Sequence, residues 1–127
     1  FTKQIVLMEK CHQDHVLRVG NLSARRAITD VRDLIESFWL GVHHCVPGES
    51  YNVSGERVYQ IKEIVEILRK LTPVSFTEHI DHSLLRTTDE KIIFGDSAKF
   101  KSLTGWTQKI SLEQTLKDML DYWRQVL

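Results

Sequence analysis

The stretch Asn21–Asp33 constrains the fold most, because it combines two adjacent cations with a helix start in thirteen residues. Arg25 and Arg26 follow an apolar strand candidate on a short connection. Asp30 stands where its side chain can accept from the free amides of a helix that begins at the next residue, and the helix dipole favours a carboxylate in that first turn. Paired guanidinium groups held before a helix suit bidentate binding of phosphate, so the stretch is interpreted as an anion site.

Four longer helices are predicted, three of them from apolar residues that recur at helical spacing. The first spans Phe1 to Cys11, the second begins at Val31 and ends before Pro47-Gly48, the third spans Ile61 to Leu71, and the last begins after Ser111, where Gln114 completes a capping-box pattern. The last helix should direct these residues inward: Leu112, Leu116, Met119, Leu120, Trp123 and Leu127. A common core is expected from Leu34, Phe38, Ile64, Leu68, Leu116, Leu120 and Trp123.

Short strands are predicted between these helices. They are His15–Val19, Glu49–Val53, Val74–His79 and Ile92–Phe94, with a brief helix to Leu103 that Asp96 or Ser97 caps. The predicted fold class is therefore α/β, a small mixed sheet with packed helices in one domain.

Composition narrows the class of protein. The chain has 127 residues, 42% of them apolar and 27% charged, which is ordinary for one globular domain. The formal net charge is zero, which argues against a nucleic-acid partner, and no apolar run is long enough to suggest a membrane span. Cys11 and Cys45 are expected to be free thiols in a reducing, cytoplasmic compartment.

Histidines occur at two places with spacings that resemble metal ligands. One is His79-x-x-His82 with Asp81 between them, and the other is His43-His44-Cys45. A structural metal site needs four well-placed ligands, and no second pair completes either group. Surface histidines are favoured, and no metal is predicted.

Several short blocks are spread over the whole chain: Gly20-Asn-Leu-x-Ala-Arg-Arg26, Thr29-Asp-Val-Arg-Asp33, Tyr51-Asn-Val-Ser-Gly55, Arg86-Thr-Thr-Asp89, Gly95-Asp-Ser-Ala-Lys99, Gly105-Trp106 and Leu112–Trp123. In this order they resemble blocks of the extended short-chain dehydrogenases that act on nucleotide sugars. The resemblance is strongest to the branch of GDP-mannose 4,6-dehydratase and GDP-4-keto-6-deoxymannose reductase.

The resemblance also implies which part of such an enzyme this is. The family binds NADP through a Gly-rich turn of a Rossmann fold and uses a Tyr-x-x-x-Lys pair, and neither pattern is in this sequence. Residues 1–127 are therefore expected to be a single C-terminal substrate-binding portion, with NADP bound by an N-terminal domain outside this chain. On this interpretation the chain alone is inactive, its partner is a GDP-sugar, and homo-oligomers form only through the full-length enzyme.

Six site residues are carried over from the family. Arg26 and Arg86 would reach the diphosphate and Asp89 the ribose hydroxyls. Val19 and Asn21 would lie beside the base, with Asn21 equally explained as a turn residue, and Gln4 would lie near the nucleotide. Two departures bear on this set, since Ala27 replaces an acid that could steady Arg26 and Thr87 replaces a proline that would stiffen the loop of Arg86.

Other functions stay open at the level of sequence. One alternative is a non-catalytic, stand-alone fragment or interaction module of the same fold. A weaker one is an independent phosphate- or nucleotide-binding module. The residues do not distinguish dehydration, reduction and epimerisation, nor do they identify the sugar.

Overall fold

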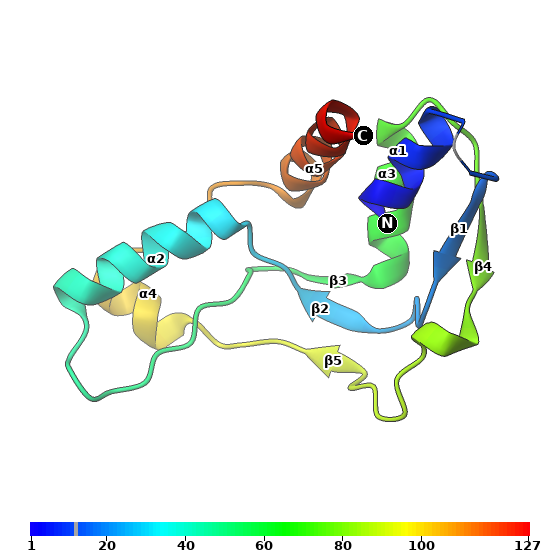
Figure 1. Cartoon of the computed structure of the whole chain (residues 1–127). Coiled ribbons are helices and arrows are strands. Elements are labelled where there is room, and N and C mark those ends of the chain that lie inside the picture. The colour runs from blue at the N-terminus through cyan, green and yellow to red at the C-terminus, as the bar shows by residue number, and fades with distance from the viewer. Residues whose placement is uncertain (12) are drawn as a thin grey trace.

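The computed structural model describes residues 1–11 and 13–127, and it has an α/β fold of helices around two small sheets (Figure 1). The elements in chain order are α1 (Thr2–Glu9), β1 (Val16–Val19), β2 (Arg25–Ala27), α2 (Val31–His44), β3 (Val58–Gln60), α3 (Ile61–Leu71), β4 (Thr77–Ile80), a 3-10 turn (His82–Leu84), β5 (Ile92–Ile93), α4 (Ala98–Thr104) and α5 (Leu112–Val126). The predicted fold class is confirmed.

The strands form two separate sheets rather than the single mixed sheet that was predicted. In the first, β1 runs parallel to β4, with Val16 opposite Thr77 and Val19 opposite Ile80. In the second, β2 lies between β3 and β5, antiparallel to the former and parallel to the latter. Strand β2 contains Arg25 and Arg26, so the arginine pair lies on a strand and not on the short, fixed connection that was predicted.

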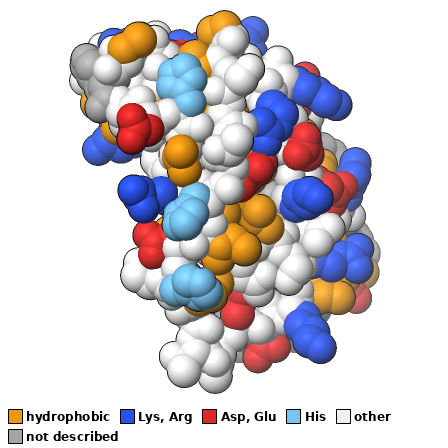
Figure 2. Space-filling view, turned by 90° about the vertical axis from the view of Figure 1, so that its right-hand side faces the viewer, with side chains coloured by type: hydrophobic (Ala, Val, Ile, Leu, Met, Phe, Trp, Pro, Cys, Tyr) orange, Lys and Arg blue, Asp and Glu red, His pale blue; other side chains and the backbone are white. Residues whose placement is uncertain are grey.

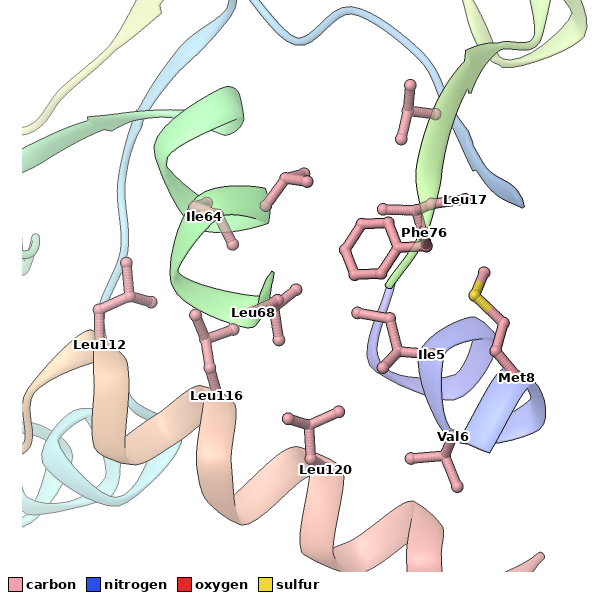
Figure 3. Close-up of a cluster of buried hydrophobic side chains, with 12 residues drawn as sticks. Ile5, Val6, Met8, Leu17, Ile64, Leu68, Phe76, Leu112, Leu116 and Leu120 are labelled. Atoms are coloured by element: carbon pink, nitrogen blue, oxygen red, sulfur yellow. The ribbon is translucent and has the colours of Figure 1, made fainter. Parts of the chain in front are cut away.

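The main hydrophobic core lies where α1, α3 and α5 face β1 (Figure 3). Ile64 and Leu68 of α3 and Leu116 and Leu120 of α5 are buried in it, as their helical spacing predicted, and Trp123 packs against it half-buried. Residues of α1, β1 and the segment before β4 complete it: Ile5, Val6, Met8, Leu17, Val19 and Phe76. Met119 and Leu127, also predicted to point inward, are exposed.

A charged cluster joins the first and last helices beside this core. Glu9 Oε1 and Oε2 accept from Arg124 Nη2 at 2.7 Å and Nε at 2.8 Å, and Thr72 Oγ1 also donates to Oε1 at 2.7 Å. The Arg124 guanidinium lowers the pKa of Glu9 below its ordinary value. The two ends of the chain consequently lie close together (Figure 1).

The predicted burial of the α2 apolar face is wrong. Val31, Ile35, Phe38 and Val42 are 58 to 80% exposed, whereas the buried residues of this helix are the polar pair Asp33 and Ser37. The physical reason is the direction in which the helix packs. Its polar face lies on α4 and on the loop before α5, where the Trp106 indole N–H donates to Asp33 O at 3.0 Å.

Two strand predictions also need correction. The segment predicted as strand Glu49–Val53 forms no strand and belongs to neither sheet, whereas β2 and β3, which were not predicted, form a ladder. The strand predicted at Val74–His79 begins only at Thr77, and its side chains are exposed rather than alternately buried. A strand needs a partner strand as well as a suitable sequence. Glu49–Val53 has no partner strand in either sheet, and the pairing of β4 with β1 begins only at Thr77.

Candidate functional site

Four of the six expected site residues line one pocket. Asn21, Arg26, Arg86 and Asp89 lie around a hollow of about 220 Å³ beside the end of β1. We call it the Arg26 pocket. Its other walls come from the N-terminus, the turn after β1, the start of α3 and the 3-10 turn: Phe1, Gly20, Ala24, Ile61 and Leu84.

Arg26 is held in a fixed position by three acceptors. Its Nη1 donates to the carbonyls of Arg25 and Glu90, both at 2.8 Å, and its Nη2 donates to Asp89 Oδ1 at 2.7 Å. The acid missing at Ala27 is thus replaced by Asp89 and two backbone carbonyls. A guanidinium carries five N–H groups, so two remain for a ligand beyond the bonds seen within residues 1–11 and 13–127.

Asp89 links Arg26 to the turn after β1. Its Oδ2 accepts from Asn21 Nδ2 at 2.7 Å, and Asn21 Oδ1 in turn accepts from the backbone N–H and the hydroxyl of Ser23 at 2.9 and 2.7 Å. Asn21 is therefore a turn residue that also borders the pocket. A carboxylate has about four acceptor positions, so Asp89 can still accept from two hydroxyl groups.

The loop that carries Arg86 is brought to the pocket by the turn after β4. Asp81 N donates to Val19 O at 2.8 Å, and Asp81 Oδ1 accepts from Ser83 N and the Ser83 hydroxyl at 2.9 and 2.6 Å. The loop then passes so close to Gly20 that a Cβ there would lie 3.0 Å from Leu84 O. Arg86 follows with an exposed side chain, so its charge is available to solvent or to a ligand.

Gln4 and Val19 are not brought to the Arg26 pocket. The Gln4 side-chain amide accepts from Arg18 N at 2.9 Å and donates to Arg18 O at 3.1 Å, which fixes α1 to β1 beside a different, 450 Å³ hollow. Val19 is fully buried in the core. The structure thus gives Val19 a packing role and leaves its side chain no surface beside a base.

Residues Thr29–Asp33 have a structural role that the sequence interpretation missed. The buried Asp30 caps α2, as predicted, by accepting from Arg32 N at 2.8 Å, and it also accepts from the Arg32 guanidinium at 2.9 Å and from Thr115 Oγ1 at 2.7 Å. Arg32 then donates to Asp118 at 2.7 Å. These bonds tie the start of α2 to α5, and the Arg32 guanidinium holds the pKa of Asp30 well below its usual range.

Three other kinds of site were sought on the described residues: a nucleic-acid interface, a metal site and a membrane span. Figure 2 shows the face over β1 and β4, where Lys and Arg are interspersed with Asp and Glu around exposed histidines, unlike the basic stripe of a nucleic-acid binder. Within residues 1–11 and 13–127, no three His, Cys, Asp or Glu side chains are grouped to hold a metal ion. Over the same residues, no helix has the length and apolar character needed to cross a bilayer.

Comparison with known proteins identifies the family. The sequence profile of GDP-mannose 4,6 dehydratase matches residues 1–119. The chain belongs to this family. It is 27% identical over 121 residues to the GDP-6-deoxy-D-mannose reductase of Pseudomonas aeruginosa, covering 95% of this chain and 40% of the reductase. It is 29% identical over 107 residues to GDP-mannose 4,6 dehydratase 1 of Arabidopsis thaliana, covering 83% of this chain and 29% of the dehydratase.

Solved structures agree with this assignment. The structure of RMD from Pseudomonas aeruginosa complexed with NADPH superposes with a TM-score of 0.91 at 26% identity, covering 99% of this chain and 41% of that one. The Y149F mutant of the UDP-glucuronic acid 4-epimerase from Bacillus cereus superposes with a TM-score of 0.79 at 23% identity, which shows the same fold. This chain thus spans about two fifths of the length of the reductase.

Proposed function

We propose that this chain is the C-terminal, nucleotide-sugar-binding part of an NADP-dependent enzyme that dehydrates GDP-mannose or reduces a 4-keto-6-deoxy GDP-sugar. Membership of the family supports the reaction class, and the names of the two relatives support a GDP-sugar over other nucleotide sugars. Because the chain spans 29 to 40% of these relatives, the reaction belongs to the larger enzyme.

The observation that carries this proposal is the grouping of Arg26, Arg86 and Asp89 around one pocket. The two arginines are sixty residues apart in sequence and repel each other, so the core gains nothing from bringing them together. A polyanion between them offsets that repulsion. A hollow of about 220 Å³ is smaller than a complete ligand site, usually about 300–1,000 Å³, so it suits the diphosphate and ribose rather than a whole nucleotide sugar.

Each of the three side chains has a distinct part in this proposal. Arg86, which is exposed, supplies a solvent-accessible cation for the diphosphate. Arg26, fixed by Asp89 and two carbonyls, supplies the pre-positioned donors. Asp89 accepts from the ribose hydroxyls with its remaining lone pairs.

The residues of this chain do not fit the NADP cofactor. Its six glycines are too far apart for a Gly-x-Gly-x-x-Gly turn, and Tyr59 and Lys62 have two residues between them instead of three. We therefore assign the cofactor and the catalytic pair to the part of the enzyme outside this chain, and we expect the isolated chain to be inactive. The free thiols of Cys11 and Cys45 support a cytoplasmic enzyme.

Titration of the chain with GDP in a calorimeter tests the binding proposal. Arg86→Ala should weaken GDP binding about tenfold or more, because a charge-assisted hydrogen bond contributes about 1.5–3 kcal/mol. Arg57→Ala is the matched control, since Arg57 is equally charged, 66% exposed and paired with Glu63 away from the Arg26 pocket. If the parent and the Arg86→Ala variant bound GDP with equal affinity, the assignment of the Arg26 pocket as the diphosphate site would be wrong.

A further inference from the structure

The side-chain amide of Asn21 makes one hydrogen bond more than its turn requires. Its Oδ1 accepts from the Ser23 backbone N–H at 2.9 Å and from the Ser23 hydroxyl at 2.7 Å, which closes the turn after β1. Its Nδ2 also donates to Asp89 Oδ2 at 2.7 Å, across 68 residues of sequence. The turn needs only an acceptor at this position, so the donation to Asp89 is a separate feature.

A second turn in this chain shows what the acceptor alone requires. Asp81 Oδ1 accepts from the Ser83 backbone N–H and the Ser83 hydroxyl at 2.9 and 2.6 Å, which is the arrangement that Asn21 has with Ser23. A carboxylate therefore closes such a turn as an amide does, but it has no N–H to donate. What the amide at position 21 adds is the hydrogen bond to Asp89.

The orientation of the Asn21 amide is fixed by its partners. Oδ1 must face Ser23, because a backbone N–H can only donate, and Nδ2 must face Asp89, because an ionised carboxylate can only accept. The two hydrogen bonds from Ser23 use both lone pairs of Oδ1. A direct contact between Asn21 and a nucleobase would therefore depend on the one remaining N–H of the amide.

Asp89 depends on side-chain hydrogen bonds for its orientation. It lies on the loop between the 3-10 turn and β5, and within residues 1–11 and 13–127 the backbone of residues 87–89 forms no backbone–backbone hydrogen bond. The carboxylate is instead held at both oxygens, by Arg26 Nη2 at Oδ1 and by Asn21 Nδ2 at Oδ2. The Asp89 side chain is only 19% exposed, so these bonds are partly shielded from water. Loss of either donor would free the carboxylate to rotate about its Cβ–Cγ bond.

From these observations we propose that Asn21 is a positioning residue for the nucleotide, and that it acts by orienting the Asp89 carboxylate. With both oxygens held, Asp89 presents its remaining acceptor positions in one orientation, so the ribose hydroxyls do not have to order it on binding. This inference rests on the proposed function, since Asp89 is the residue assigned to the ribose. It adds that recognition of the ribose depends on a side chain that acts through Asp89 rather than on the ligand itself.

Calorimetric titration of Asn21→Ser with GDP tests this role. Serine is neutral, and its hydroxyl can still accept from the N–H two residues further on, but its side chain is too short to reach Asp89. GDP should bind about fivefold more weakly, which corresponds to the loss of one hydrogen bond. Inorganic pyrophosphate has no ribose and should bind within about twofold of the parent, because the arginines that bind it are unchanged. Asn52→Ser is the matched control and should alter neither affinity, since Asn52 is exposed and is the only other asparagine of the chain.

A double-mutant cycle with Asp89→Ala separates positioning from a direct contact with the ligand. If Asn21 acts through Asp89, Asn21→Ser should change GDP affinity by less than about twofold once the carboxylate is absent. Additive losses in the double variant would indicate an independent contact of Asn21 with GDP and would overturn the proposal. An equal loss of GDP and pyrophosphate affinity in Asn21→Ser would also overturn it, because it would indicate general disruption of the Arg26 pocket. Unchanged GDP affinity in Asn21→Ser would leave Asn21 with its turn alone, and the proposal would be wrong.

Nuclear magnetic resonance of the ligand-free chain gives a measurement that requires neither GDP nor the Asn21→Ser variant. The side-chain amide of Asn21 has the exposed Asn52 as its internal reference. The Asn21 proton that donates to a carboxylate should resonate downfield of its Asn52 counterpart, and Asp89→Ala should remove this shift. An Asn21 signal that does not respond to Asp89→Ala would contradict the proposal. If the shift is present but the parent does not bind GDP, the proposed function is wrong while the orientation of Asp89 by Asn21 stands; GDP binding with additive losses contradicts the role of Asn21 alone.

Discussion

Replacing Asp89 by Asn separates two effects that one carboxylate has in the Arg26 pocket. Each carboxylate oxygen accepts one hydrogen bond of 2.7 Å, one from Arg26 and the other from Asn21. The proposed function uses the remaining lone pairs for the ribose hydroxyls. The carboxylate also repels the diphosphate, because it lies in the same pocket. The Asp89→Asn variant keeps the shape of the side chain and one carbonyl acceptor, but it loses the charge.

The two effects differ in size. A hydrogen bond to a charged group contributes about 1.5–3 kcal/mol and one to a neutral group about 0.5–1.5, so two ribose bonds should lose about 2 kcal/mol together. For a separation of about 8 Å, the screening length at physiological salt, removing one negative charge beside a doubly charged diphosphate gains about 0.5–1 kcal/mol in a solvated pocket. The net expectation is GDP binding weaker by about 1–1.5 kcal/mol, roughly five- to twelvefold.

Inorganic pyrophosphate isolates the charge effect because it has no ribose. Calorimetric titration of the variant should show pyrophosphate binding unchanged or up to about fivefold tighter, while GDP binds more weakly. Asp118→Asn serves as the control, since Asp118 of α5 is 38% exposed and pairs with Arg32 of α2. If the Asp89 variant lost the same factor for both ligands, or bound GDP more tightly, the assignment of the ribose to Asp89 would be wrong.

Two further predictions concern stability, measured by urea unfolding with Trp fluorescence. Arg32 lowers the pKa of Asp30 in the folded chain, so the ionised carboxylate stabilises the fold above the unfolded pKa of 3.8, and this stabilisation is lost as the pH falls below that value. Asp30→Asn should therefore flatten the decline in unfolding free energy between about pH 5 and pH 2. An unchanged slope would contradict this prediction. Gly55→Ala should cost about 1–3 kcal/mol, because a Cβ there would lie 2.3 Å from Ile28 O. The control is Gly41→Ala in α2, where a Cβ would lie at an ordinary 3.8 Å from Phe100 Cε2 of α4. It should stabilise the chain by about 0.5–1 kcal/mol, and equal effects of the two substitutions would exclude the clash at Gly55.

Sequence patterns correctly predicted the helices whose apolar faces pack against other residues of this chain. Helix α3 has its apolar stripe against the core and a solvated charged face, and α5 begins at Ser111, whose hydroxyl accepts from Gln114 N at 3.2 Å. In both cases local pattern and packing agree. Helical spacing predicted α2 equally well as a helix, but spacing tells only that one face is apolar and not what covers it.

The candidate site was predictable only through the family resemblance. Arg26 and Asp89 are hydrogen-bonded across 63 residues of sequence, and no local pattern in either segment predicts contact with the other. The carbonyls that help hold Arg26 depend on the pairing of β2 with β5, which sequence alone did not predict. Gln4 and Val19 were also carried over from the family one by one. In the structure the Gln4 amide bonds to Arg18 and the Val19 side chain is buried, and their roles beside a nucleotide stay predictions.

The contact between α1 and α5 sets an order of events for synthesis. Glu9 and Arg124 meet across 115 residues, and the wall of the core opposite Ile5 and Val6 is supplied by Leu116 and Leu120. A growing chain therefore makes α1 early and cannot complete the burial of its apolar side until α5 has been translated. Contacts that join distant segments are formed late and slowly, and apolar surface exposed in the meantime is open to aggregation or to chaperones. The partly synthesised chain is therefore the form most prone to aggregation, and α5 removes this risk by covering the apolar side of α1.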